Sequence, residues 1–419
     1  MKNTAKQDYV WNTAAGLINA AEAVIMSMIV TRITGLADAG MLTMAFAVGN
    51  LIMPIGKFGI RNYQVTDIDN IFSFSIYLKA RMVTVTMMLI AIAGYISYAF
   101  FELQYGKEKI GIILAICMIY VVEAAEDVFW GYYQRQGHLY AGAKMFCFRW
   151  LGILIIFPIS LYISKSLSKA LMICFMVSFI LFVIILYVSY PNICSDEDRH
   201  LKLFLTKSDL PIVGRLLKIA FPLFGISFLS FYVNNAPKYA IDACLSDEIQ
   251  ACYGFVAMPV FVIGLLNGFI YQPTLVLMAA EWEQKQYLKF GKRIIRQLLL
   301  ISVILAVCLA GAYVLGIPVL SWLYHTDLTD YKAELLILLV AGTFLAISGY
   351  LSVVLTVMRC QKDLLWPYCL VAVTAAIVLK KTVSQYGTLG AAVCYMLLML
   401  LLCLIYGGIL IVRLKRTKI

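Results

Sequence analysis

Charged residues are scarce in this sequence. Asp, Glu, Lys and Arg make up 14% of its 419 residues, whereas hydrophobic residues make up 63%. Soluble domains carry about 25% charged and about 45–50% apolar residues. The difference excludes an ordinary soluble domain and favours a protein that lies largely within a lipid bilayer.

The patterns that mark metal sites and nucleotide-dependent enzymes are also missing. The eleven cysteines contain no CxxC pair and no paired Cys/His spacing, and the three histidines lie in separate predicted loops. No GxxxxGK[ST] sequence is present. The predicted loops are too short for a catalytic domain, so we predict a protein that is not an enzyme and holds no metal or cofactor. Cys244 and Cys252 flank one predicted outer loop and could pair, but free thiols are favoured.

Long apolar runs are what the sequence has instead. Because a membrane-spanning helix needs about 20 largely apolar residues, these runs predict an all-α, multi-pass membrane protein of about twelve helices. The predicted spans are residues 10–31, 39–59, 80–101, 110–131, 145–163, 167–190, 217–240, 250–272, 295–317, 334–357, 364–381 and 388–412.

The distribution of basic residues orients these helices. The net charge is +11, and most Lys and Arg fall on one predicted side of the membrane, including the Arg413–Lys418 tail. Cytoplasmic loops are enriched in these residues, so both termini are expected in the cytoplasm. The expected partner for this charge is the anionic lipid of the inner leaflet rather than nucleic acid.

The longest polar stretch divides the chain in the middle. Residues 191–216 follow the sixth predicted helix and form a predicted cytoplasmic linker, although they could be an ordinary loop. The predicted lobes are residues 1–190 and 217–419, with six helices each. A weak internal repeat supports pseudo-symmetry, since each lobe begins with a helix that has a basic residue near its outer end, followed by a proline-containing helix.

Polar residues inside the predicted spans are the candidate functional residues, because they are costly in a bilayer unless they face a cavity or a partner. In the first helix, Asn12, Asn19 and Glu22 share one face, since steps of seven and three residues nearly complete helical turns. Glu22 lies near the middle of the span. We interpret it as a cavity-lining carboxylate for coupling or gating; the alternative is a helix–helix hydrogen bond.

The fourth predicted helix carries three carboxylates on one face. Glu123, Glu126 and Asp127 follow i, i+3, i+4 spacing. The following helix returns antiparallel and sets Asp127 roughly level with Arg149, which predicts a buried carboxylate–guanidinium pair. A structural role and a role as a cytoplasmic gate remain equally open.

The seventh predicted helix carries a second polar stripe of Asn235, Lys238 and Asp242. Pro237 removes a backbone donor there and predicts a kink that exposes polar groups to a cavity. The ammonium of Lys238 suits a phosphate. The alternative is a lysine that extends to the membrane surface and pairs locally with Asp242.

Two further cations lie at the end of the second predicted helix. Lys57 and Arg61 are four residues apart, and we expect them on one face, next to Gly56 and Gly59. This arrangement suits an anionic head group that enters from the inner leaflet. A positive-inside stop signal explains the same residues equally well.

At these positions the sequence resembles the Wzx-like oligosaccharide flippases of polysaccharide biosynthesis, which share a superfamily with the multidrug and toxin extruders and the peptidoglycan lipid flippase. The residues that carry the resemblance are Pro54–Gln64 with Asp67, Glu123–Gly131, Asn234–Asp242 and Met258–Pro273. The resemblance extends along the whole chain in helix count and layout. The sequence differs from the peptidoglycan lipid flippase in having about twelve predicted helices rather than about fourteen.

The resemblance implies two six-helix lobes around a central cavity that opens alternately to each side of a bacterial cytoplasmic membrane. The implied substrate is an oligosaccharide linked to undecaprenyl pyrophosphate, and the implied partners are membrane lipids, a polysaccharide polymerase and glycosyltransferases. A cation-coupled multidrug extruder of the same fold is the alternative. The candidate anion or sugar contacts are Arg32, Lys57, Arg61, Asn234, Asn235 and Lys238, and the candidate coupling or gating residues are Glu22, Glu123, Glu126, Asp127, Arg149 and Asp242.

Overall fold

The computed structural model describes residues 2–67, 69–195, 205–260, 263 and 274–417, in which all regular secondary structure is helical. The α-helices are α1 (Lys2–Ile33), α2 (Leu36–Lys57), α3 (Ile60–Thr66), α4 (Phe74–Phe101), α5 (Lys107–Arg135), α6 (Leu139–Ser164), α7 (Leu167–Ile193), α8 (Leu210–Cys244), α9 (Asp247–Ala257), α11 (Leu275–Glu283), α12 (Tyr287–Gly311), α13 (Ile317–Tyr324), α14 (Lys332–Val357) and α15 (Leu365–Thr417). The π-helix η3 (Ala312–Gly316) joins α12 to α13, and η4 (Thr329–Tyr331) and η5 (Gln361–Asp363) are short 3₁₀ turns.

These helices confirm an all-helical, multi-pass membrane protein. Within the described residues, nine helical segments are long and apolar enough to cross a membrane. The predicted number of twelve is not exact. The two last predicted helices form one element, α15, with a break at Gly387, and the predicted helix 250–272 lies partly outside the described residues. α5 is as long as its neighbours but is not among these nine, since Glu123, Glu126 and Asp127 lie within its apolar part.

The chain divides into two compact units, residues 1–231 and 232–419, and the division falls within α8. The first unit holds α1 to α7 and the first part of α8, and the second unit holds the remainder. The lobe boundaries at residues 190 and 217 stay a prediction, and part of the predicted linker lies outside the described residues.

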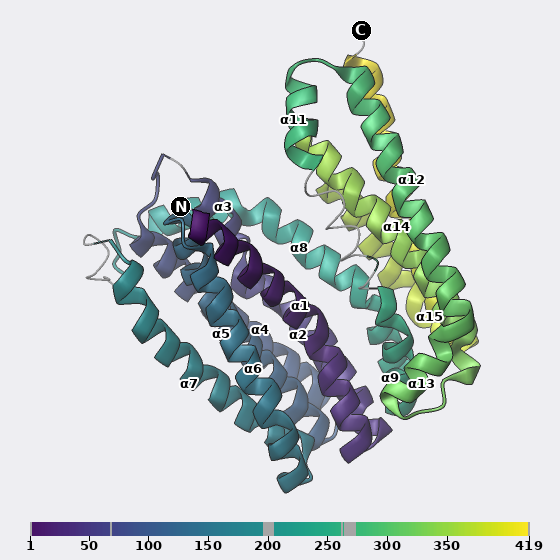
Figure 1. The fold of residues 1–419 in the computed structure, drawn as a ribbon. Coiled ribbons are helices and arrows are strands. Elements are labelled where there is room, and N and C mark those ends of the chain that lie inside the picture. Colours follow the sequence, from purple (N-terminus) through teal and green to yellow (C-terminus); the bar gives the residue numbers. More distant parts are fainter. Residues whose placement is uncertain (1, 68, 196–204, 261–262, 264–273, 418–419) are drawn as a thin grey trace. The chain divides into compact units, whose positions relative to one another are not determined.

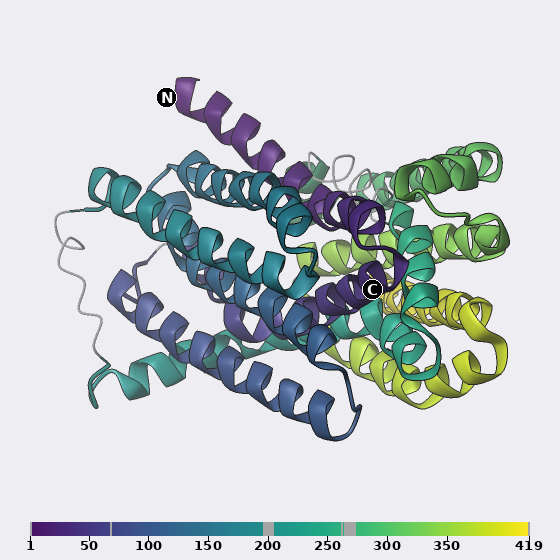
Figure 2. The same ribbon diagram turned by 90° about the horizontal axis from the view of Figure 1, so that it is seen from below.

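In the first unit, α2 and α5 are central. α4, α5, α6 and α7 run side by side along the unit (Figures 1 and 2), and α5 packs against α2, α3, α4, α6 and α7. α2 is the most buried candidate span, with 78% of its apolar window inside the structure. Three charged residues of α5, Glu123, Glu126 and Asp127, are buried among these helices, where each needs a partner.

α2 ends at an abrupt break in the backbone. Phe58 (φ 48°) and Gly59 (φ 67°) are both left-handed, and α3 begins at the next residue. The ring of Phe58 stacks on Phe224 of α8 with centroids 4.5 Å apart, and a Cβ on Gly59 would lie 2.8 Å from Leu223. Glycine at 59 thus permits both the turn and the close approach of α8.

An ion pair between Lys79 and Asp209 ties the start of α8 to α4. The ammonium of Lys79 donates to Asp209 at 2.8 Å, and Thr206 donates to the same carboxylate through its hydroxyl and its backbone N–H. These hydrogen bonds, that from Lys79 above all, lower the pKa of Asp209 to about 2. The carboxylate is therefore ionised at neutral pH and holds the first turn of α8 against the first unit.

In the second unit, α12, α14 and α15 run side by side (Figure 1). Two ion pairs join segments within this unit: Arg293 of α12 pairs with Glu281 of α11, and Arg413 of α15 pairs with Asp363 of η5 at 2.5 Å. All eleven cysteines are free, so the favoured prediction of free thiols at Cys244 and Cys252 is confirmed.

Candidate functional site

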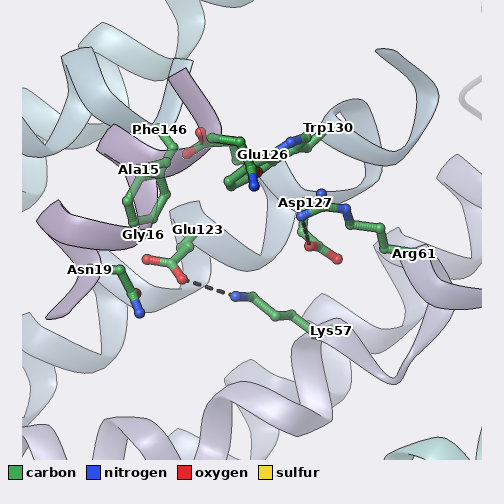
Figure 3. A pocket seen from close by; sticks show the side chains of 11 residues that line it. Ala15, Gly16, Asn19, Lys57, Arg61, Glu123, Glu126, Asp127, Trp130 and Phe146 are labelled. Carbon is green, nitrogen blue, oxygen red and sulfur yellow. Dashed lines mark hydrogen bonds and ion pairs between the residues drawn. The ribbon is translucent and has the colours of Figure 1, made fainter. Parts of the chain in front are cut away.

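A cavity of about 260 Å³ lies within the first unit, among α1, α2, α3, α5 and α6. Figure 3 shows Gly16 and Asn19 of α1 across from Lys57 and Arg61. The lining residues are Asn12, Ala15, Gly16, Asn19, Lys57, Arg61, Glu123, Glu126, Asp127, Trp130 and Phe146. Five of the predicted site residues are therefore brought together: both cations near the end of α2 and the three predicted carboxylates of α5.

Glu123 is the carboxylate closest to Lys57, and its two oxygens face different partners. Oε1 accepts a hydrogen bond from the Lys57 ammonium at 2.9 Å, which Figure 3 marks. Oε2 accepts from Arg149 and from the indole N–H of Trp150, each at 3.3 Å. Glu123 therefore connects a cation of the cavity to a guanidinium in the interior.

Arg149 is fully buried and pairs with Glu126 at 2.5 Å as well as with Glu123. The predicted pair between Arg149 and Asp127 is wrong, although a buried carboxylate–guanidinium pair between these two helices is present. Adjacent residues on a helix point about 100° apart. Glu126 therefore faces α6, while Asp127 faces α3 and α4.

Asp127 pairs instead with two other arginines. Its Oδ2 accepts from Arg81 of α4 at 2.7 Å, and its Oδ1 lies 3.6 Å from Arg61 of α3. Arg81 also donates to the backbone carbonyl of Gly56 near the end of α2. The sequence interpretation missed Arg81; the available signal was a guanidinium two residues inside a predicted span, where a charge is costly without a partner.

Lys57 and Arg61 do not share a helical face, contrary to expectation. Lys57 is the last residue of α2 and Arg61 lies in α3, beyond the left-handed pair Phe58–Gly59. The break brings both side chains to one cavity. The Arg61 guanidinium lies 4.1 Å from the ring centroid of Trp130 and donates to Gln134 at 3.0 Å, so it is held from α5.

The accessible charges of the cavity are its cations. The side chains of Lys57 and Arg61 are 32% and 24% exposed, whereas those of Glu123, Glu126 and Asp127 are 6%, 1% and 10% exposed. The two cations therefore present more exposed side chain to a molecule in the cavity than the three carboxylates do.

Of the polar residues predicted on one face of α1, two line the cavity and one is buried against another helix. Asn12 and Asn19 line the cavity, but Glu22 does not. Glu22 is 5% exposed, and the hydroxyl of Tyr120 donates to its Oε1 at 3.4 Å. Its assignment as a coupling residue stays a prediction.

The other predicted residues do not line this cavity. Arg32 is exposed at the end of α1. Asn234, Asn235, Lys238 and Asp242 belong to the part of α8 in the second unit, where Asn234 accepts a hydrogen bond from Tyr395 at 3.1 Å and Asn235 is buried. α8 continues through Pro237 to Cys244. Their binding and gating roles stay predictions.

Among the described residues, no group of three or more His, Cys, Asp or Glu side chains is placed to hold a metal ion.

The site consists of cations, carboxylates, two asparagines and two aromatic rings. Such a set can bind an ionic ligand by charge and hydrogen bonding.

No protein-family model matches the sequence, and no curated protein matches it. Solved structures do match the fold. An inward-facing multidrug resistance transporter of the MATE family, described as a member of the MOP superfamily, is 13% identical, with a TM-score of 0.68 over 97% of this chain and 96% of that one. The inward closed form of the lipid II flippase MurJ is 10% identical, with a TM-score of 0.72 over 95% of this chain and 86% of that one.

A MOP superfamily transporter from Pyrococcus furiosus is 14% identical, with a TM-score of 0.58 over 99% of this chain and 95% of that one. It is described as having a binding pocket of reverse polarity that suggests a different function. At such low identities the likeness concerns the fold. The chain is thus a multi-pass membrane protein with the fold of these transporters.

Proposed function

We propose that this protein is a flippase that moves oligosaccharides linked to undecaprenyl pyrophosphate from the inner to the outer leaflet of a bacterial cytoplasmic membrane, by alternating access. The observation that carries the proposal is the exposure of Lys57 and Arg61 in a cavity whose carboxylates are buried and pair with the interior Arg81 and Arg149 as well. Ammonium and guanidinium groups are the side chains that bind phosphate best. The fold of the lipid II flippase supports the proposal.

The remaining lining residues suit the other parts of such a substrate. Asn12 and Asn19 offer amides that can bind sugar hydroxyls, and Trp130 offers an aromatic face. A polysaccharide polymerase and glycosyltransferases are the proposed partners, because they would use the product and supply the substrate.

Replacing Lys57 or Arg61 by Ala tests this function in a strain that makes its surface polysaccharide only with this protein. We expect each variant to reach the membrane and to lower surface polysaccharide by about tenfold or more, since a charge-assisted phosphate contact is worth about 1.5–3 kcal/mol. Lys169→Ala is the matched control, because Lys169 is an exposed lysine on α7 away from the cavity. Normal polysaccharide from both variants would contradict the phosphate role.

The second candidate is a cation-coupled multidrug extruder, which the carboxylates Glu123, Glu126 and Asp127 in the same cavity favour. A strain that lacks the protein separates the two functions. Intact polysaccharide with hypersensitivity to organic cations indicates the extruder, whereas loss of polysaccharide with unchanged drug sensitivity indicates the flippase.

A further inference from the structure

Glu123 and Asp127 each pair with one cation that lines the cavity and one arginine that is buried. One of the Glu123 oxygens accepts from Lys57, a cation of the cavity, at 2.9 Å. The other oxygen accepts from Arg149, a buried residue that also donates a hydrogen bond to Glu126 at 2.5 Å. Glu123 thus has one partner that a ligand can reach and one that it cannot.

Asp127 repeats the arrangement on the other side of α5. Its Oδ1 faces Arg61, the second cation of the cavity, at 3.6 Å. Its Oδ2 faces Arg81, which is 2% exposed, at 2.7 Å. Again the outer partner lines the cavity and the inner partner does not.

The inner arginines decide what happens when an anion enters. A ligand that takes Lys57 and Arg61 must displace the carboxylates that hold them. A buried carboxylate left without a cation is strongly unfavourable. Glu123 and Asp127 lower that cost because each keeps an inner arginine: Asp127 keeps Arg81, and Glu123 shares Arg149 with Glu126.

We propose that Glu123 and Asp127 are exchangeable counter-ions, which pair with Lys57 and Arg61 until the two phosphates of an isoprenyl pyrophosphate displace them. This inference rests on the proposed function. Arg81 and Arg149 act as positioning residues, since they hold the displaced carboxylates and do not touch the ligand. A diphosphate is favoured over a monophosphate because it can replace both carboxylates at once.

The exchange also explains how a site with two accessible cations can release its cargo. A transporter must bind its substrate tightly enough to load it and weakly enough to let it go. Carboxylates that return to Lys57 and Arg61 compete with the pyrophosphate and make its departure easier. An isolated pair of cations would have no such competitor.

Binding to the purified full-length protein in phosphatidylcholine nanodiscs tests the proposal. The probe is farnesyl pyrophosphate, and its dissociation constant is measured by titration calorimetry for wild type, Glu123→Gln and Asp127→Asn. Inorganic pyrophosphate is titrated in parallel to separate a lipid-borne from a free pyrophosphate. Glu108→Gln is the matched control: it makes the same change in net charge, but Glu108 contacts Ser166 and Ser168 rather than the cavity.

We expect Glu123→Gln and Asp127→Asn each to bind farnesyl pyrophosphate about two- to tenfold more tightly than wild type, because each removes a competitor worth about one ion pair. Glu108→Gln should match wild type, and inorganic pyrophosphate should rank the variants in the same order. Unchanged or weaker binding by both cavity variants, with normal binding by wild type, would overturn the exchange alone. Absence of pyrophosphate binding by wild type and both variants would overturn the proposed function and the exchange together.

Discussion

At the scale of single residues, the cost of burying charge governs the centre of the first unit. Arg81 and Arg149 are almost fully buried, and each is neutralised by a carboxylate of α5. Removing one member of such a pair leaves the other buried without compensation. These two arginines are therefore expected to matter for stability, whereas the partly exposed Lys57 and Arg61 are expected to matter for binding.

Replacing Arg81 by Met should destabilise the protein by about 3 kcal/mol, at the lower end of the range for a broken buried pair, because Asp127 keeps Arg61. The measurement is the free energy of unfolding in a titration with a denaturing detergent. Arg359→Ala is the control: Arg359 also pairs with a carboxylate, Glu283, but its side chain is 86% exposed. That variant should stay within about 1 kcal/mol of wild type. Equal losses in both variants would contradict the role assigned to burial.

At the scale of helices, close packing of α5 and α6 positions the aromatic side of the cavity. Gly142 of α6 lies against Trp130 of α5, and a Cβ at position 142 would lie 2.2 Å from the indole Cδ1 and 2.9 Å from the Cα. Trp130 in turn lies over the Arg61 guanidinium. A glycine on one helix therefore determines where a cation on another helix is held.

Replacing Gly142 by Ala should cost about 1–3 kcal/mol of unfolding free energy, because the added methyl group must displace Trp130 or separate the helices. Surface polysaccharide should fall with it as Arg61 loses its aromatic contact. Gly94→Ala is the control, since position 94 is exposed on α4 with open space around it. Alanine there favours the helix and should leave stability unchanged or slightly raised. A Gly142→Ala protein as stable and active as wild type would show that α6 does not position Trp130.

At the scale of the whole molecule, the chain consists of two helical units that share α8. Its first turn is tied to α4 through Lys79 and Asp209, and its last residues belong to the second unit. The chain therefore passes from the first unit to the second within one helix. The basic C-terminal tail and the charge distribution predict that both termini are cytoplasmic.

Reporter fusions test this orientation. A fluorescent protein fused after Thr417 should fold and fluoresce, because it stays in the cytoplasm, and alkaline phosphatase at the same site should be inactive. Alkaline phosphatase fused in the turn at Thr329, between α13 and α14, should be active, since this turn is predicted to lie outside. The opposite activities at the two sites would reverse the predicted orientation.

Composition and apolar runs alone were enough to determine that this is an all-helical membrane protein. They also located the cations at the end of α2 and the carboxylates of α5, because a charge in or beside an apolar run is costly and stands out in the sequence. The choice of partners was decided only by the tertiary structure. Glu126 rather than Asp127 meets Arg149, and Arg81 crosses from α4 to Asp127. Spacing along one helix gives the face of a side chain, but the neighbour on that face depends on how separate helices pack, and on backbone breaks such as Phe58–Gly59 that bring Lys57 and Arg61 to one cavity.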